Sequence, residues 1–287
     1  MNSSKLKWLL IIIFLTVNIY FLHQYKTYSN AVENYTDKEI STTVDILKDK
    51  GVLLNENVIP TKKTSEPVLK FEFDETWREK VAGQLMHGSF NSYVLPDGIG
   101  YNGETEKLLF YGSHLFEYTV ESPVSLDSKD YFTLSDTSGI DEGEKYSRKL
   151  TERLFPQALT DTHKISLRLL SFFSDEKEVY IKAQQVINGI PIDQSEVEAV
   201  YCESAFVHIR GNIFFSTDIN SLEADSLDVI NVLFNIDESN SEITKIEELY
   251  YPVTTDTGSV YLTPSYKLTY NDGSVHLWDG TSCVQRY

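Results

Sequence analysis

The pattern of apolar and polar residues separates a short apolar segment near the N-terminus from a long remainder of mixed character. Residues 8–22, WLLIIIFLTVNIYFL, contain no charged side chain, and Lys5 and Lys7 precede them. A spanning helix needs about 20 predominantly apolar residues, a length that is reached if Lys7 snorkels and the flanking tyrosines lie near the interface. The pattern therefore predicts a transmembrane helix at residues 8–25 after a cytoplasmic arm at residues 1–7.

A cleaved signal peptide is the alternative interpretation of this segment. Ser29, Asn30 and Ala31 offer small residues of the type found at cleavage sites. The bulky polar run HQYKTY separates them from the apolar segment, which favours a retained anchor. The basic residues Lys5 and Lys7 favour a cytoplasmic N-terminus. We therefore expect a single-pass protein of the cell membrane whose C-terminal part is extracellular.

Three helices are expected in the exported part. Thr36 and Glu39 have the spacing of a capping box, and apolar residues then recur at helical intervals until Gly51. A second helix is expected around residues 146–154, where Tyr146, Leu150 and Leu154 share one face, and a third at residues 222–235.

Alternating apolar and polar residues predict strands over most of the rest. Asn188 and Gly189 form a strong hairpin-turn signal, and the polar run 135–139 places a boundary between exported parts 26–138 and 139–287. The fold class expected is α+β, with antiparallel sheets and short helices packed on one face. The expected strands are 68–73, 108–111, 114–120, 131–134, 164–173, 178–188, 194–202, 205–215, 243–251, 259–270 and 274–279.

Composition and charge narrow the functional classes. The chain has 287 residues, 41% of them hydrophobic, and a formal net charge of -18. The hydrophobic content is that of a folded protein, and so acidic a chain repels phosphates, so we expect no nucleic-acid partner. The six histidines are isolated in the sequence, and the calcium-loop pattern at residues 237–248 has Glu242 where glycine is needed and Lys245 at a ligand position. We therefore expect no metal and no cofactor.

Catalytic motifs are also missing from the sequence. No G-x-S-x-G motif occurs, and Cys202 and Cys283 lack the spacing of a redox pair. Glu196 and Glu198 lie two apart on an alternating strand, so they are expected on its solvent-facing side. We expect a protein that is not an enzyme; the alternatives are a membrane-anchored cell-wall hydrolase or an extracellular ligand- or peptide-binding module.

Aromatic residues gather near the C-terminus, where Tyr250, Tyr251, Tyr266, Tyr270 and Trp278 occur close together in the sequence. Amphipathic rings of this kind suit either the edge of a core or a protein interface. Both interpretations stay open, and Tyr266 and Trp278 are the candidate partner-binding residues of this region.

Four segments together resemble a known family. They are KLKWLLIIIFLTVNIYFLHQY, VDILKDKGVLLNENVIP, QQVINGIPIDQSEVEAVY and YLTPSYKLTYNDGSVHLWDG. In this order they resemble the YycI-type proteins, relatives of YycH, and the last two segments also look like the repeat of PepSY-type domains. Tyr266 stands where tryptophan is common in that repeat, and the chain has Asp279-Gly280-Thr281 in place of its usual turn.

The resemblance implies a YycI-like, PepSY-like fold and a non-enzymatic regulator of the WalK (YycG) sensor histidine kinase, which controls cell-wall metabolism in low-GC Gram-positive bacteria. It implies that the N-terminal helix associates with the kinase and with a YycH-like protein. Thr16 and Asn18 are then the natural polar contacts within the bilayer, and Tyr20 is a further candidate contact of the same helix. The exported domain is expected to share in the regulation.

Overall fold

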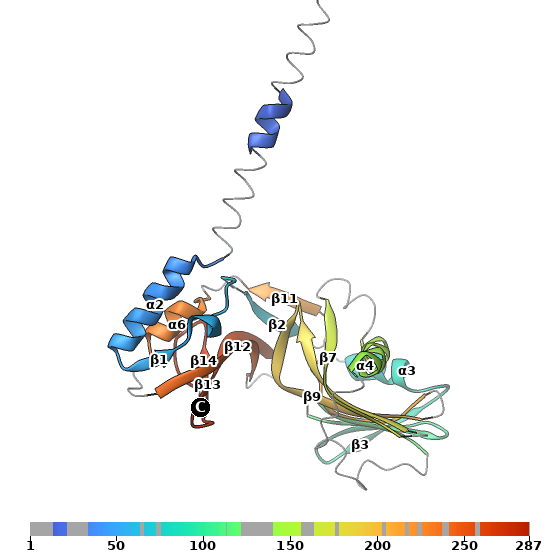
Figure 1. Ribbon diagram of the computed structural model, residues 1–287. Coiled ribbons are helices and arrows are strands. Elements are labelled where there is room, and N and C mark those ends of the chain that lie inside the picture. Colours follow the sequence, from blue (N-terminus) through green and yellow to red (C-terminus); the bar gives the residue numbers. More distant parts are fainter. Residues whose placement is uncertain are drawn as a thin grey trace, which may run out of the picture. The chain divides into compact units, whose positions relative to one another are not determined.

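The chain forms two compact units in the computed structural model (Figure 1). Unit 1 comprises residues 1–66, 225–247 and 266–287, and unit 2 comprises residues 67–224 and 248–265. The two later cuts fall inside strands β12 (Ser241–Thr254) and β13 (Val260–Tyr270). The structure describes residues 14–21, 34–63, 66–72, 76–112, 114–121, 140–155, 164–175, 178–202, 205–215, 218–222, 226–236, 241–255 and 259–286.

In unit 1, helix α2 (Asp37–Asp49) confirms the first helix predicted for the exported part. Thr36 Oγ1 accepts a hydrogen bond from the Glu39 N–H at 3.2 Å, and the Thr36 N–H donates to Glu39 Oε2 at 2.7 Å. This reciprocal pair satisfies backbone donors that the first helical turn leaves without partners. Gly51, with φ 87°, follows the helix and supplies the left-handed conformation that turns the chain.

The core of unit 1 joins its helices to its strands. Strand β1 (Val52–Leu54), which precedes the 3-10 turn η1 (Glu56–Val58), pairs in parallel with the start of β12. Helix α6 (Val229–Phe234) packs against α2, and β14 (Val275–Asp279) pairs with β13. Fully buried members of this core are Leu47, Val232, Leu233, Ile236 and Leu268.

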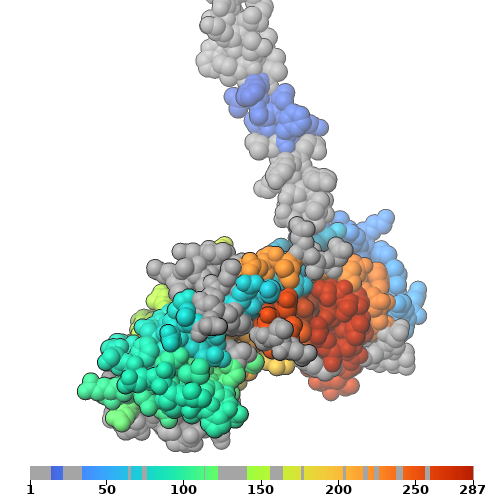
Figure 2. Space-filling view, turned by 180° about the vertical axis from the view of Figure 1, so that it is seen from behind, coloured from blue at the N-terminus to red at the C-terminus, as the bar shows by residue number. Residues whose placement is uncertain are grey.

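Unit 2 is built on a mixed sheet whose strands run in the order β11-β2-β13-β12-β9-β10-β6-β5-β4-β3, with β7 and β8 continuing from β9. Seen from behind, the β3 to β6 region forms one continuous surface of unit 2 (Figure 2). The strands not bounded above are β2 (Val68–Glu72), β3 (Asn91–Leu95), β4 (Gly98–Asn102), β5 (Glu106–Tyr111), β6 (Leu115–Val120), β7 (Ile165–Ser174), β8 (Glu178–Ile187), β9 (Ile190–Cys202), β10 (Ala205–Asn212) and β11 (Asp218–Leu222).

Two helices cover one face of this sheet (Figure 1). Helix α4 (Ile140–Leu154) packs on β7 and β8, and α3 (Trp77–Leu85) packs on α4. Leu150 and Leu154 are fully buried, as the predicted apolar face of the second helix required. Trp77 meets the Phe110 ring edge-on with centroids 5.2 Å apart, so α3 is fixed to the sheet by aromatic packing.

The expected hairpin between β8 and β9 is confirmed. Asn188 and Gly189 both have positive φ, 53° and 92°, the combination that a type I′ turn requires. The ladder closes directly against them, with Ile187 paired to Ile190. A short-range sequence signal thus sets the register where the hairpin closes, and a bulge between Gln184 and Val186 shifts it farther along the ladder.

The expected fold class was wrong in two respects. The pairings of β1 with β12 and of β12 with β9 are parallel, so the architecture is a mixed sheet and not a set of antiparallel sheets. Within the described residues, no helix combines the length and the apolar character needed to cross a bilayer. Of the expected span 8–25, the structure describes only residues 14–21, which are helical.

Other expectations differ in detail. The third helix is shorter than expected, because Leu222 ends strand β11 and α6 begins only at Val229. Helix α3 and strands β1, β3, β4 and β11 were not predicted. The expected strand at residues 131–134 and the expected domain boundary at residues 135–139 lie outside the described residues.

Candidate functional site

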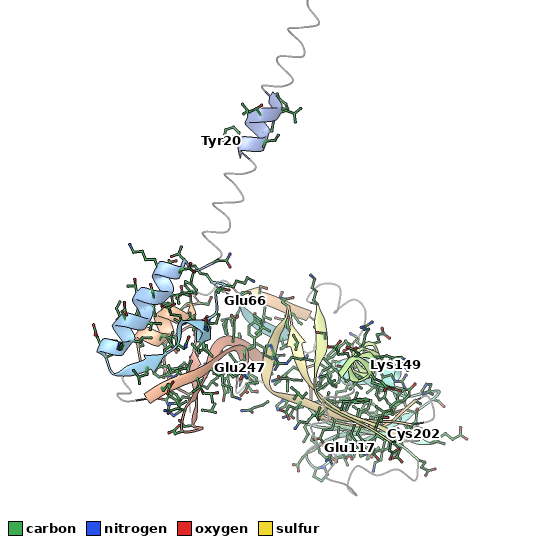
Figure 3. The ribbon with its side chains drawn as sticks, in the orientation of Figure 1. Tyr20, Glu66, Glu117, Lys149, Cys202 and Glu247 are labelled. Carbon is green, nitrogen blue, oxygen red and sulfur yellow. The ribbon has the colours of Figure 1, made fainter. Side chains whose placement is uncertain are left out.

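The N-terminal candidate residues Thr16, Asn18 and Tyr20 lie on the helical segment 14–21. All three are exposed, and Tyr20 projects from the segment (Figure 3). The Asn18 side-chain amide donates to the Phe14 carbonyl at 2.8 Å, one helical turn earlier. Part of the polar capacity of Asn18 is therefore used within its own helix, while its side-chain oxygen is still an acceptor.

Apolar side chains dominate the surface of the same segment. Phe14, Ile19 and Phe21 are 71%, 60% and 63% exposed, and Leu15 and Val17 are exposed as well. Single exposed apolar residues are ordinary, but a contiguous apolar surface marks a site of contact with another molecule. Segment 14–21 is thus the first candidate binding surface of this chain.

The C-terminal candidates Tyr266 and Trp278 are buried in the core of unit 1, with exposed fractions of 2% and 7%. Tyr266 Oη donates to the Leu227 carbonyl at 3.2 Å. Of the two interpretations of the aromatic cluster, the structure favours the core for these residues. Both rings stabilise unit 1 from within, and neither presents its face on the surface of the unit.

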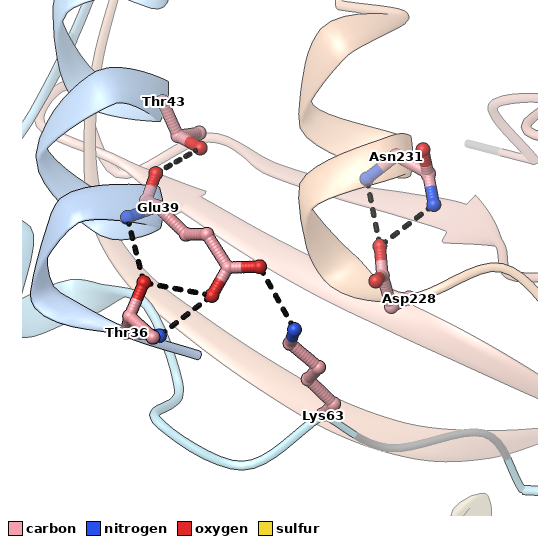
Figure 4. Close-up of polar contacts among 6 residues, drawn as sticks. All are labelled: Thr36, Glu39, Thr43, Lys63, Asp228 and Asn231. Carbon is pink, nitrogen blue, oxygen red and sulfur yellow. Dashed lines mark hydrogen bonds and ion pairs between the residues drawn. The ribbon is translucent and has the colours of Figure 1, made fainter. Parts of the chain in front are cut away.

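A first pocket, of about 370 Å³, lies in unit 1 between α2 and α6. The two carboxylates that line it already have partners (Figure 4): Glu39 receives bonds from Thr36 and from Lys63 at 2.9 Å, and Asp228 caps α6 by accepting from Asn231. The hydrogen bonds from Thr36 and Lys63 lower the pKa of Glu39 to about 2. This network has the form of helix capping, so it accounts for the local structure without a ligand.

A larger pocket, of about 630 Å³, lies in unit 2 and is called the α4 pocket below. Helix α4 lines one wall with Lys149, Glu152 and Arg153. Strands of the sheet supply the rest, including Glu106 from β5 and Tyr118 from β6. Tyr201 and Phe206, near the turn from β9 to β10, add an aromatic wall, with ring centroids 5.1 Å apart.

Glu106 is held firmly at one side of the α4 pocket. Its side chain is almost fully buried and accepts the His87 backbone N–H at 2.5 Å and the Tyr118 hydroxyl at 2.9 Å, and it lies 2.7 Å from His87 Nδ1. Burial alone would raise the pKa of Glu106, but the bonds from His87 and Tyr118 outweigh it and lower the pKa. The Glu106 carboxylate is therefore charged, and its oxygens are already bonded to His87 and Tyr118.

The two cations of the α4 pocket are less committed. Lys149 Nζ donates to Tyr201 Oη at 3.1 Å and lies 4.6 Å from the centre of that ring, and its hydrogen bond raises the pKa of Lys149. Arg153 donates to the Leu85 carbonyl. Among the residues the structure describes, neither Lys149 nor Arg153 has a carboxylate within ion-pair distance. Lys149 and Arg153, one helical turn apart on α4, thus place two positive charges opposite the aromatic wall of the pocket.

Glu106 is not free to act as a general base in the α4 pocket. Its buried carboxylate is saturated by hydrogen bonds, whereas a general base needs a free lone pair aimed at the substrate. In the described ranges, no group of three or more His, Cys, Asp or Glu side chains is placed to hold a metal ion. Sequence reasoning missed Lys149 and Arg153, although their spacing of four on a predicted helix was a readable signal.

Glu196 and Glu198 lie on the solvent-facing side of β9, as predicted. Glu196 pairs with Lys182 at 2.5 Å, and Glu198 pairs with Arg210 at 3.1 Å, while the intervening Val197 is fully buried. These cross-strand pairs bind the carboxylates to neighbouring strands of the sheet. Their partners explain both residues as parts of a charged ladder.

Comparison with known proteins places the chain near two solved structures. One is an uncharacterized protein from Eubacterium rectale ATCC 33656, with a TM-score of 0.47, 10% identity and coverage of 83% of this chain and 91% of that one. The other is the Bacillus megaterium YpeB C-terminal domain, with a TM-score of 0.34, 9% identity and coverage of 76% and 97%. No protein-family model and no curated protein matches the sequence. At TM-scores below 0.5, these two similarities assign neither a fold family nor a function.

Proposed function

We propose that this chain is a non-enzymatic regulator of a sensor histidine kinase and that it contacts the kinase through segment 14–21. The observation that carries the proposal is the exposed apolar surface of this segment, on which Phe14, Ile19 and Phe21 are each at least 60% exposed. Apolar surface in water costs about 25 cal/mol per Å². A helix with such a surface is stabilised when a partner helix covers it.

The sequence resemblance to the YycI-type proteins supports the choice of partner. It points to a kinase of the WalK (YycG) type, to a YycH-like protein as second partner, and to control of cell-wall metabolism. Residence at the cell membrane, with the acidic body outside, belongs to the same proposal. Regulation of this kind requires that the chain bind one signalling state of the kinase more tightly than the other.

The polar residues of the segment give the contact its specificity. Close packing and polar bonds drive helix association where apolar contact alone does not discriminate. Asn18 donates to Phe14 within its own helix, so its side-chain oxygen is the group that can accept a bond from a partner. Such interhelical bonds contribute about 0.6 to 2 kcal/mol, equivalent to about a 3- to 30-fold change in affinity.

Site-specific photo-crosslinking in cells that contain the kinase tests the proposal. A crosslinker in place of Thr16 or Tyr20 should capture the kinase, and one in place of Asp45, exposed on α2, should not. Asn18→Leu should lower the yield by about 3- to 30-fold, whereas the matched variant Val17→Leu should preserve it. Capture from Asp45 alone, or an unchanged yield with Asn18→Leu, would contradict contact through this segment.

A segment exchange tests whether the contact regulates. Replacing residues 14–21 with an unrelated apolar helix should abolish control of kinase phosphorylation while the circular dichroism of the remainder stays unchanged. Retention of full control by the exchanged chain would assign the coupling to units 1 and 2 instead.

A further inference from the structure

We propose that the α4 pocket binds a small molecule or peptide end that carries one carboxylate next to an aromatic or aliphatic group. This site is separate from segment 14–21, and its test does not depend on the kinase. The pocket volume of about 630 Å³ falls within the range of small-molecule sites, about 300 to 1,000 Å³.

The charge of the pocket selects an anion. Lys149 and Arg153 lie on the same wall, one helical turn apart, and no described carboxylate pairs with either. Lys149 uses one of its three donors on Tyr201, and Arg153 donates to the Leu85 carbonyl and to the Tyr118 hydroxyl, so each cation keeps only part of its donor set. The remaining donors suit a carboxylate, which accepts bonds from both groups.

The acidic neighbours limit the charge of that anion. Glu106 and Glu152 also line the pocket. The charge of Glu106 is balanced by donors from His87 and Tyr118, but it still repels a second negative charge nearby. A monoanion is therefore favoured over a phosphate, whose charge at neutral pH is about -1.5 to -2.

The apolar part of the ligand is set by the opposite wall. Phe206 is 8% exposed and packs edge-on against Tyr201, with Val120 beside them. Aromatic walls of this type bind flat or branched apolar groups and contribute beyond the area they bury. The ligand therefore places its carboxylate at α4 and its apolar group against the ends of β6, β9 and β10.

Calorimetry or NMR chemical-shift titration of the full chain with N-acetylphenylalanine tests whether the α4 pocket binds a monocarboxylate. The neutral amide of the same compound should bind at least about tenfold more weakly, because it removes a charge-assisted bond. Phenyl phosphate should bind more weakly than the acid. Amide binding as tight as acid binding, or tighter binding of phenyl phosphate, would overturn the monocarboxylate assignment, as would no binding of the acid at millimolar concentrations.

Variants of α4 provide the matched controls. Lys149→Gln should weaken N-acetylphenylalanine at least about tenfold, whereas Lys145→Gln and Arg148→Gln, exposed on the same helix and outside the pocket, should leave affinity within about twofold. Thermal unfolding of all three should match the unaltered chain, because these side chains are not in the core. An equal loss of affinity with Lys145→Gln would show a general charge effect and would contradict binding in the α4 pocket.

Discussion

Tyr118 and Glu106 form a buried pair in unit 2, in which the tyrosine hydroxyl donates to the carboxylate at 2.9 Å and the two residues are 1% and 9% exposed. Burial together with the Glu106 carboxylate raises the pKa of Tyr118 to about 12. Burial raises the pKa of Glu106, but the hydrogen bonds that it accepts lower this pKa by more, so the net shift is downward. At neutral pH the pair is a neutral phenol bonded to a charged carboxylate.

The stability of unit 2 should therefore fall in acid through Glu106. A carboxyl whose pKa is lower in the folded than in the unfolded chain contributes stability above its unfolded pKa, and the contribution is lost as pH falls through the folded pKa. Glu106→Gln should cost about 1.5 to 3 kcal/mol at pH 7 and flatten the pH dependence below the unfolded pKa. Urea unfolding between neutral and acidic pH measures both, and Glu104→Gln, exposed nearby, should change neither.

Gln185 should be indispensable to the packing of unit 2. Its fully buried amide donates to the Phe214 carbonyl at 3.1 Å and accepts the Phe214 N–H at 2.9 Å, which imitates a pair of sheet hydrogen bonds. Gln185→Leu leaves both backbone groups buried without these partners, at a cost of about 2 to 4 kcal/mol. The denaturant midpoint should fall with an unchanged m-value, and a midpoint equal to that of the unaltered chain would contradict this bonding.

Local signals in the sequence were enough to predict two of the helices, α2 and α4. The capping box at Thr36 and Glu39 and the apolar face at Leu150 and Leu154 each act within a few turns of chain, and the structure contains both. Helix α3 has apolar residues at Trp77, Val81 and Leu85, a spacing of four that could have been recognised. Thr76 and Glu79 before it also have the spacing of a capping box, so a start signal was present in the sequence, although Thr76 makes no side-chain cap in the structure and Gly83 weakens the helical pattern.

The parallel pairings and the α4 pocket depend on contacts far apart in the sequence. Lys149 lies on α4, whereas Glu106 and Phe206 come from strands that only the sheet order brings to the same cavity. Periodicity shows which face of an element is apolar, not which other element covers it. For the same reason the sequence left Tyr266 and Trp278 open between core and interface, and the closure of unit 1 around them decides for the core.

Asp279 should anchor the C-terminal turn of unit 1. Its buried carboxylate accepts from the Thr281 N–H at 2.7 Å and the Ser282 N–H at 3.1 Å and pairs with Arg286. Burial raises the pKa of Asp279, but the bonds from Thr281 and the charge of Arg286 outweigh it and lower the pKa. Asp279→Ala should lower the unfolding free energy by about 2 to 4 kcal/mol, because two backbone donors lose a charged acceptor.

The matched variant Arg286→Gln should cost much less. Removing the partly buried guanidinium leaves the bonds from Thr281 and Ser282 in place, so the loss should be about 1 kcal/mol or less. Thermal or urea unfolding compares the two variants. Equal losses would mean that the ion pair, and not the turn hydrogen bonds, holds this end of unit 1.

Two helical glycines should respond in opposite directions to alanine. Gly83, exposed on α3, has no atom within 4 Å of the position a Cβ would take, whereas at Gly143 on α4 a Cβ would lie 2.5 Å from Leu169 Cδ2 and 3.0 Å from Phe172 Cβ. Alanine is favoured over glycine in a helix by about 0.5 to 1 kcal/mol. Gly83→Ala should therefore raise the unfolding free energy by about that amount.

At Gly143 the same helical gain meets overpacking. The Leu169 side chain can rotate away, but the Cβ of Phe172 is fixed to the backbone of β7, so α4 must shift from the sheet. Overpacking of this kind costs about 1 to 3 kcal/mol, and Gly143→Ala should lower the unfolding free energy. Urea unfolding of both variants side by side gives the signs directly. A gain for Gly143→Ala equal to that for Gly83→Ala would mean that α4 does not approach β7 as closely as the structure places it, and the wall that carries Lys149 and Arg153 would have to be redrawn with it.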